Sequence, residues 1–470
     1  MATPLRVEFT NQNTTYGADQ MWITMVVNPG QNVCFGGTTE QVPFANSYNN
    51  SPTYQITDTK LKNGIDVYSA ISLRFFVSIG TPLKACTFEP GQWQPGQCKG
   101  FGGPTFTNPN DPNWNVRWDI FELTVSNPRS PDDLGDLSSI NGYGIPMMID
   151  TFSLPLPGSS GQGLTTARSY AGTAPYASLE ALMKKNSSNN NLGGVPADGI
   201  VKNGTNFLRL IGPPNGAFAP ALATGGPFPS LNFYLTDVYN KRTRTPITDV
   251  GRISGHTWDL TAGATADQMT LSGKLDGELF TMAVDADKYV GKPNAMYTFS
   301  SMVYQAPGTG TQNPGLHFTY KGNSITEADL ITALDKHNPH GRKALAEIYH
   351  DVFTAYSYGF IGNNAVVKGW ANPTYGRKSI NDMGSAGWVQ LAGDVGAGKV
   401  PLSNVPLFSR RAGMEVGYHN EWASRLYTSS PSVYGFAYSD FFQFPIGQHT
   451  YRLPNGTPVN SWRVTVLPDP

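Results

Sequence analysis

Charged side chains are scarce in this 470-residue chain. Asp, Glu, Lys and Arg make up 14 % of it and the formal net charge is −1, whereas charged residues make up about 25 % of an average soluble protein. The longest basic runs are Lys184-Lys185 and Arg410-Arg411. Because nucleic-acid binding needs clustered Lys and Arg to neutralise phosphates, no nucleic-acid partner is expected.

Long apolar runs are also missing, and cysteine is rare. No run approaches the ~18–20 residues that cross a bilayer, so no membrane partner is expected. Of the three cysteines, Cys86 and Cys98 flank a Gly/Pro-rich stretch, which favours a loop closed by a disulfide over two free thiols. Cys34 is left over and is expected to be buried. Three cysteines at these spacings do not make a zinc set, and no metal or cofactor is expected.

A disulfide implies an oxidising compartment, so we expect a secreted protein. The first residues pass directly into a strand pattern, and no signal-peptide pattern is visible among them. We expect that Met1-Ala2 replaces a removed leader. We also expect a monomer.

Glycine, proline and aromatic residues are abundant, with 51 Gly, 36 Pro and 12 % aromatics. Surfaces built from Asn, Ser, Thr, Gly and Tyr suit neutral ligands such as sugars, whose hydroxyls meet amides and whose C–H faces meet rings. The same composition also fits any turn-rich β protein with a polar surface.

Residues 1–165 read as strands separated by Gly, Pro and Asn clusters, which predicts a β-barrel or β-sandwich domain. Residues 166–430 read as a mixed α/β domain, and 431–470 as C-terminal strands that return to the sheet of either domain. The predicted fold is therefore mainly β with an α+β part, and with a groove between two domains. The helices are predicted at 178–185, at 231–244, from a capping box at Ser324 and Glu327 to before Pro339, at 342–356, and at 413–428.

Two acidic residues stand out because apolar strand residues surround them. Glu122 lies in WDIFELTV and Asp150 in IPMMIDTFSL. In an alternating strand Glu122 shares its face with Thr124. Hydrolysis of a glycosidic bond requires two carboxyl groups, one protonated and one ionised. The alternative is that each acid pairs with a buried Arg or caps a bulge.

The segment from Trp118 to Leu156 resembles the catalytic segment of glycoside hydrolase family 64, the laminaripentaose-producing β-1,3-glucanases of the thaumatin-like superfamily. The matching residues are Trp118, Glu122-Leu123-Thr124 and Ile149-Asp150-Thr151-Phe152. Weaker matches follow in order at Leu208-Arg209-Leu210, Asp237–Lys241, Gly251–Gly255 and Tyr434–Asp440. The resemblance implies that Glu122 is the general acid and Asp150 the general base.

The chain also departs from the family pattern. The stretch between the two acids, 127–144, is expected to be a long loop. Ser126 replaces an Asn, and Tyr143 replaces a groove tryptophan. We expect Thr124, Ser126 and Tyr143 to bind the substrate. The acids of the loop, Asp132, Asp133 and Asp136, are rival candidates for the base, although acids in polar loops are usually solvated.

The resemblance implies an inverting, endo-acting β-1,3-glucanase that needs no cofactor and releases short oligosaccharides from a neutral polysaccharide. The alternative is a non-catalytic glucan-binding or toxin-like defence protein on the same scaffold.

Overall fold

The computed structural model describes the larger part of the chain. It covers residues 3–44, 51–84, 104, 106, 109, 111–130, 133–140, 142–152, 166–172, 176–186, 196, 198–212, 245–253, 255–264, 268–285, 316–408, 419–429, 433–435, 442, 444, 449–450 and 459–469. The helix predicted at 231–244, the expected bond between Cys86 and Cys98, and Asp132 lie outside it.

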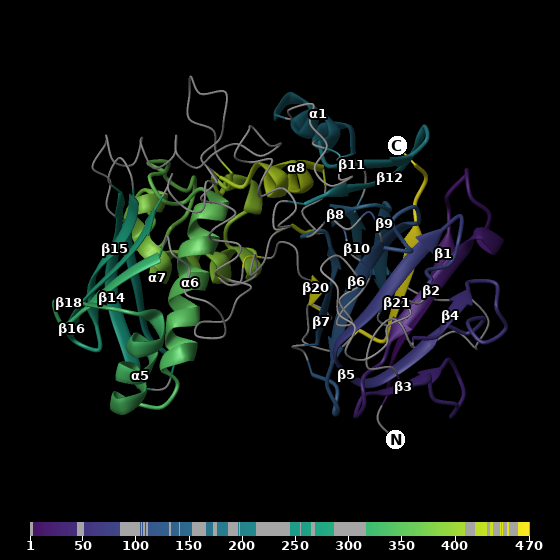
Figure 1. Cartoon of the computed structure of the whole chain (residues 1–470), viewed down its shortest axis with the longest axis horizontal. Coiled ribbons are helices and arrows are strands. Elements are labelled where there is room, and N and C mark those ends of the chain that lie inside the picture. Colours follow the sequence, from purple (N-terminus) through teal and green to yellow (C-terminus); the bar gives the residue numbers. More distant parts are fainter. Residues whose placement is uncertain are drawn as a thin grey trace.

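The elements form two lobes, one made mainly of strands and one made of helices against a sheet (Figure 1). The β lobe carries a mixed sheet of twelve strands. These strands are β1 (Leu5–Asn11), β2 (Met21–Val26), β3 (Asn32–Phe35), β4 (Thr53–Gln55), β5 (Ile65–Ile79), β6 (Arg117–Val125), β7 (Leu134–Ser138), β9 (Met147–Phe152), β10 (Thr166–Gly172), β19 (Val433–Tyr434), β20 (His449–Thr450) and β21 (Ser461–Val466).

The main path through this sheet runs β10-β9-β21-β1-β5-β6-β7-β19. The first half of β5 pairs with β1 and its second half with β6, and the ladder to β6 is irregular between Ala70 and Leu73. Ser72 within this bulge has a φ of 52°. A bulge bends a strand, so β5 passes from one layer into the other. No ladder between described residues joins the two ends of the path, so the predicted mainly β fold is confirmed as two layers rather than a closed barrel.

The inner faces of the two layers share one hydrophobic core. Phe9 of β1 lies 6.0 Å from Phe75 of β5 and 6.3 Å from Phe121 of β6, measured between ring centroids. Trp462 of β21 is fully buried in the same core. The sequence periodicity of two therefore assigns alternate residues of each strand to this core and to an outer face.

A small sheet and two helices cover one end of the β lobe, near the C-terminus (Figure 1). The sheet has the order β11-β12-β8. The elements are β8 (Gly142–Tyr143), β11 (Ile200–Asn203), β12 (Asn206–Ile211), α1 (Tyr176–Asn186) and α8 (Glu421–Ser429), and a short 3-10 turn, Ala18–Gln20, precedes β2.

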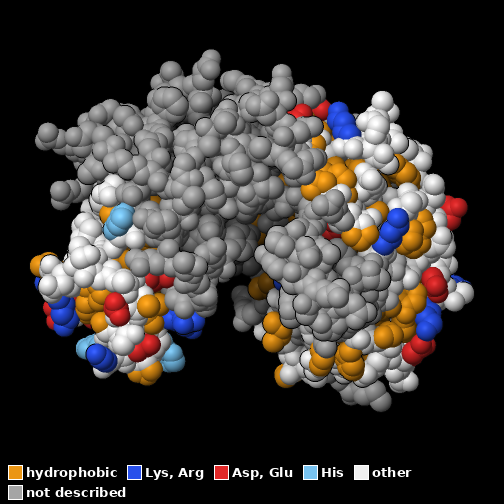
Figure 2. Space-filling view, viewed as in Figure 1, with side chains coloured by type: hydrophobic (Ala, Val, Ile, Leu, Met, Phe, Trp, Pro, Cys, Tyr) orange, Lys and Arg blue, Asp and Glu red, His pale blue; other side chains and the backbone are white. Residues whose placement is uncertain are grey.

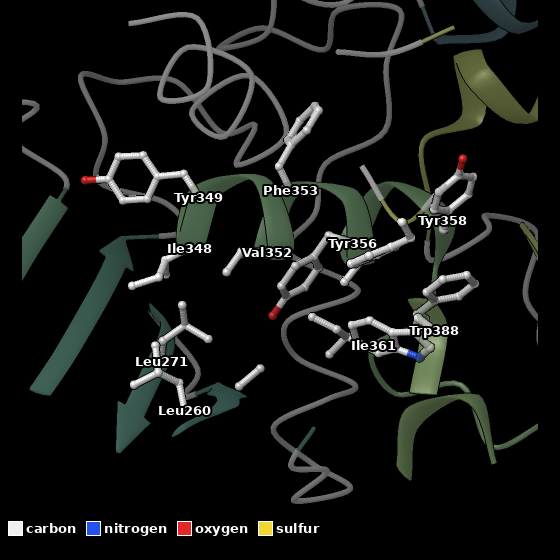
Figure 3. Packing of buried hydrophobic residues seen from close by; sticks show 14 of the residues in the cluster. Leu260, Leu271, Ile348, Tyr349, Val352, Phe353, Tyr356, Tyr358, Ile361 and Trp388 are labelled. Carbon is white, nitrogen blue, oxygen red and sulfur yellow. The ribbon is translucent and has the colours of Figure 1, made fainter. Parts of the chain in front are cut away.

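The helical lobe packs three helices on a six-stranded antiparallel sheet, ordered β13 to β18. Its elements are β13 (Thr245–Ile253), β14 (His256–Ala264), β15 (Gln268–Leu275), β16 (Glu278–Asp285), β17 (Leu316–Tyr320), β18 (Asn323–Ile325), α5 (Glu327–His337), α6 (Gly341–Tyr358), α7 (Ile380–Gly396) and a 3-10 turn, Leu402–Asn404. Ile348 and Val352 of α6 point towards Leu260 and Leu271 of the sheet (Figure 3). No described helix is long and apolar enough to cross a membrane.

Local sequence signals predicted most of these helices. The helices expected at 178–185 and 342–356 correspond to α1 and α6, and α8 occupies the second half of 413–428. The cap of α5 is Thr326, which accepts the N–H of Asp329, rather than Ser324. Helix α7 was not predicted because its sequence is rich in Gly, although Ser379 caps it by accepting the N–H of Asp382.

Candidate active site

Glu122 lies on the outer face of the β lobe. Along β6, Phe121, Leu123 and Val125 point into the core and Glu122 alternates with them. Trp118, earlier on the strand, belongs to a small apolar cluster outside the main core. The outer face of β6 is therefore apolar at Trp118 and becomes polar at Glu122. The predicted alternation of β6 is confirmed.

Arg74 of β5 is the cross-strand neighbour of Glu122. Its Nε donates to Oε2 of Glu122 at 3.1 Å, and the two side chains are 38 % and 27 % exposed. The pair is therefore only partly buried, whereas a deeply buried ion pair would give Glu122 a purely structural role. The hydrogen bond orients the carboxyl group while leaving it accessible.

Asp136 of β7 is the neighbour of Glu122 on the other side. Directly opposed residues of antiparallel strands share a face and have Cβ atoms about 4.5–5.5 Å apart. Asp136 is half-buried, and its Oδ1 is shielded from solvent. Two carboxyl groups therefore lie on one outer face of the sheet. Strand β7, which carries Asp136, lies on the side of the β lobe nearer the helical lobe (Figure 1).

The stretch expected to be a long loop contains strand β7. Leu137 lies opposite Phe121 and enters the core, while Asp136 alternates with it. The signal was present in the sequence as LGDLS, in which polar and apolar residues alternate. It was missed because a five-residue strand between polar turns resembles a loop in composition.

The structure does not bring Asp150 to Glu122. Asp150 lies on β9, between Ile149 and Thr151, whose strand neighbours Val464 and Trp462 belong to the core between the layers. Asp150 therefore points outward from the layer formed by β9, β21 and β1. Glu122 points outward from the opposite layer, so the expectation that these two strands present their acids to one groove does not hold. The two strands are close in the sequence, but this did not show that β9 pairs with β21 in the other layer.

An arginine lies beside Asp150 across the sheet. Arg463 of β21 is its cross-strand neighbour, and its guanidinium lies over the Phe152 ring, 4.9 Å from the centroid. On its other side Arg463 faces Glu8, with a distance of 3.5 Å between Nη2 and Oε2. Asp150 thus belongs to a row of alternating charge, Glu8–Arg463–Asp150, across three strands.

Two of the predicted binding residues follow Glu122 along the chain. Thr124 shares its outer face, and its Oγ1 accepts the N–H of Ser72 at 3.1 Å. Ser126 is exposed beyond the end of the strand, and its N–H donates to Oδ1 of Asp133 at 2.7 Å. Asp133 is fully buried and also binds Arg129, so this rival base is structural.

Tyr143, the third predicted binding residue, is placed elsewhere. It lies on β8, is 2 % exposed, and lines a pocket at the covered end of the β lobe together with Arg117 and Phe207. Tyr143 is therefore not on the surface that carries Glu122 and Asp136.

A buried acid on β6, Asp119, anchors the segment that leads into β9. Its Oδ2 accepts the N–H groups of Gly144 and Ile145 at 2.8 and 3.0 Å, and its Oδ1 accepts that of Ile120 at 2.8 Å. Burial raises the pKa of Asp119 to about 7, against the opposing effect of these N–H groups.

The raised pKa of Asp119 predicts how stability depends on pH. The folded protein binds a proton more tightly than the unfolded chain, so the free energy of unfolding should fall as pH rises from about 4 to about 7. Each unit of pKa difference corresponds to about 1.4 kcal/mol. Denaturant unfolding at several pH values measures this slope. The Asp119→Asn variant should be less stable at pH 4 and should show a smaller slope; an unchanged slope would assign the pH dependence to other groups.

The described residues contain no group of three or more His, Cys, Asp or Glu side chains placed to hold a metal ion. The site consists of two carboxyl groups, an arginine and neighbouring hydroxyls. Such a surface can transfer protons and bind hydroxyls of a neutral ligand.

A model of the protein family described as β-1,3-glucanase matches residues 4–338 of the chain. Among solved structures, the chain is similar to a β-1,3-glucanase domain from Clostridium beijerinckii, with 12 % identity, 99 % of this chain and 98 % of that chain covered, and a TM-score of 0.48. It is similar to a laminaripentaose-producing β-1,3-glucanase in complex with laminaritetraose, with 14 % identity, coverages of 99 % and 98 %, and a TM-score of 0.46. For a laminaripentaose-producing β-1,3-glucanase from Paenibacillus barengoltzii, identity is 14 %, coverages are 99 % and 75 %, and the TM-score is 0.42. A search of curated proteins found no match.

Proposed function

The chain belongs to glycoside hydrolase family 64, the β-1,3-glucanases, and on that premise we propose that it cuts β-1,3-glucan internally, with inversion, through Glu122 and Asp136. The observation that carries this pairing is the register of β6 and β7, which sets the two acids directly opposite each other. This proposal replaces Asp150 with Asp136 as the partner of Glu122.

The proposed reaction assigns one proton transfer to each acid. Glu122 donates a proton to the oxygen of the leaving sugar, while Asp136 removes a proton from a water that attacks the anomeric carbon. An inverting enzyme holds its two carboxyl groups ~6.5–9.5 Å apart so that this water fits, whereas a retaining enzyme holds them ~5–5.5 Å apart. Side chains that diverge slightly from opposed Cβ positions are compatible with the wider gap.

The surface around the pair supports a neutral substrate. On the face shown in Figure 2, Lys and Arg side chains are interspersed with Asp and Glu, and the molecule is hollowed between its two lobes. Beside the acids, Thr124 and Ser126 supply hydroxyl groups. A long, uncharged polysaccharide can lie along such a surface and exchange hydrogen bonds with hydroxyls. We further propose that the protein is secreted and acts as a monomer without a cofactor.

Digestion of a linear β-1,3-glucan tests the function. We expect reducing ends and short laminari-oligosaccharides to appear when the protein is incubated with laminarin or curdlan. Proton NMR of the first products should show the α-anomer, because inversion converts a β-linkage into an α-configured reducing end. First products with the β-anomer would overturn inversion. Depletion of the protein onto glucan without new reducing ends would instead identify a non-catalytic glucan-binding protein.

A further inference from the structure

A pocket lies apart from the two acids, at the end of the β lobe that the small sheet covers. Its volume is about 230 Å³. The lining comes from three regions: the segment after β1, the β11–β12 hairpin, and a floor that Arg117 and Tyr143 share with the C-terminal segment. Arg117 is five residues before Glu122, about 16 Å along the strand, and points to the opposite face. The pocket is therefore separate from the candidate active site.

The pocket is electrically neutral because its two charged groups pair with each other. Arg117 Nη2 lies 2.6 Å from Oδ1 of Asp469, and Arg117 Nε donates to the carbonyl of Gly144 at 2.8 Å. The guanidinium also lies over the ring of Phe207, 5.3 Å from its centroid. An ionic ligand would have to compete with Asp469 for Arg117 or with Arg117 for Asp469, so the pocket favours an uncharged ligand.

The walls of the pocket carry the groups that bind sugars. Tyr16, Tyr143 and Phe207 supply aromatic rings, while exposed Thr205 and Asn206 supply a hydroxyl and an amide at the mouth. Pockets for drug-sized ligands are about 300–1,000 Å³. The smaller volume here fits a single pyranose ring rather than a chain of them.

The walls are held in place without a ligand. Asn13 is buried, its Oδ1 accepts the N–H groups of Thr15 and Tyr16 at 2.9 and 3.0 Å, and its Nδ2 donates to the carbonyl of Leu467 at 3.1 Å. On the opposite wall the hairpin turns tightly through Gly204, whose φ is 60°. A pocket that is ordered before binding loses less entropy when the ligand enters.

We propose that this pocket binds one glucosyl unit of β-1,3-glucan as an accessory site, an inference that rests on the proposed function. A second point of attachment raises the apparent affinity for a polymer, because the second contact becomes intramolecular. It leaves the turnover of short soluble substrates unchanged, because the pocket contains neither Glu122 nor Asp136.

Calorimetric titration of the full-length Glu122→Gln variant with laminaribiose tests the site without turnover. Adding Thr205→Ala and Asn206→Ala removes two hydrogen-bonding groups from exposed positions, so the core stays intact. We expect the affinity of the pocket to fall by about 5–150-fold. Lys202→Ala, on the same hairpin and outside the lining, is the matched control and should bind like the parent.

Three results would overturn the accessory site: an unchanged isotherm in the Thr205/Asn206 variant, an equal loss in Lys202→Ala, or equal affinity for mannobiose. The accessory site is supported if insoluble curdlan retains the protein with the Thr205/Asn206 substitutions less well than the parent. In an otherwise unmodified enzyme, the same substitutions should leave kcat on short soluble oligosaccharides unchanged. Failure of the proposed function is read separately, from the absence of reducing ends with the unmodified protein. Sugar binding in the pocket is measured with the Glu122→Gln variant, so it can be detected whether or not the unmodified protein releases reducing ends.

Discussion

Glu122→Gln is expected to lower kcat on laminarin by about 10²–10⁴-fold, the usual contribution of a positioned general acid. Glutamine has the shape of glutamate and its oxygen still accepts a hydrogen bond from Arg74, whose Nε lies 3.1 Å from Oε2 of the native carboxylate. It has no proton to give to the leaving oxygen. Release of reducing ends at saturating substrate measures the loss.

The matched control for this variant is Glu8→Gln. Glu8 is also a partly exposed glutamate on an outer face and faces an arginine, Arg463. It lies on the opposite layer, so its loss should leave kcat unchanged while costing a similar surface ion pair. If Glu122→Gln retained near-normal turnover with an intact fold, Glu122 would have no part in the chemistry.

Asp136→Asn is expected to reduce kcat by a similar factor, about 10²–10⁴-fold, because an amide cannot take a proton from water. Asp150→Asn should leave kcat within about twofold of the unmodified enzyme, since proton transfer requires hydrogen-bond reach of the reacting atoms and Asp150 projects from the other layer. Both residues are half-buried aspartates in strand interiors. Each variant therefore controls for the effect that losing a half-buried carboxylate has on folding.

The opposite pattern would reverse the assignment. Loss of activity in Asp150→Asn together with near-normal turnover in Asp136→Asn would identify Asp150 as the base, as the resemblance of Ile149-Asp150-Thr151-Phe152 implies. Thermal or denaturant unfolding of both variants separates a chemical effect from loss of folded protein. Asp150→Asn is the variant in which a change in stability is expected, because Arg463 lies beside it.

Periodicity along the chain was enough to predict the face on which Glu122 lies. Phe121, Leu123 and Val125 alternate with it, and a strand with one buried side cannot place them otherwise. The family resemblance of the surrounding residues pointed to the same glutamate. The helices α1 and α6 were likewise predictable, because apolar residues at helical spacing require a buried face.

The partner of Glu122 was a matter of tertiary structure. Asp136 and Asp150 both alternate with apolar residues, but the longer apolar run around Asp150 favoured that residue, and no local signal shows which strand pairs with β6. The choice depends on which strand lies beside β6: the short β7 pairs with it, whereas β9 pairs with β21 in the other layer. Strand pairing is a long-range contact whose free energy comes from the shared core rather than from the residues near either acid. The sequence by itself therefore determined the β architecture and the outward face of Glu122, because both follow from local periodicity. Only the folded sheet decided which second carboxyl group lies opposite it.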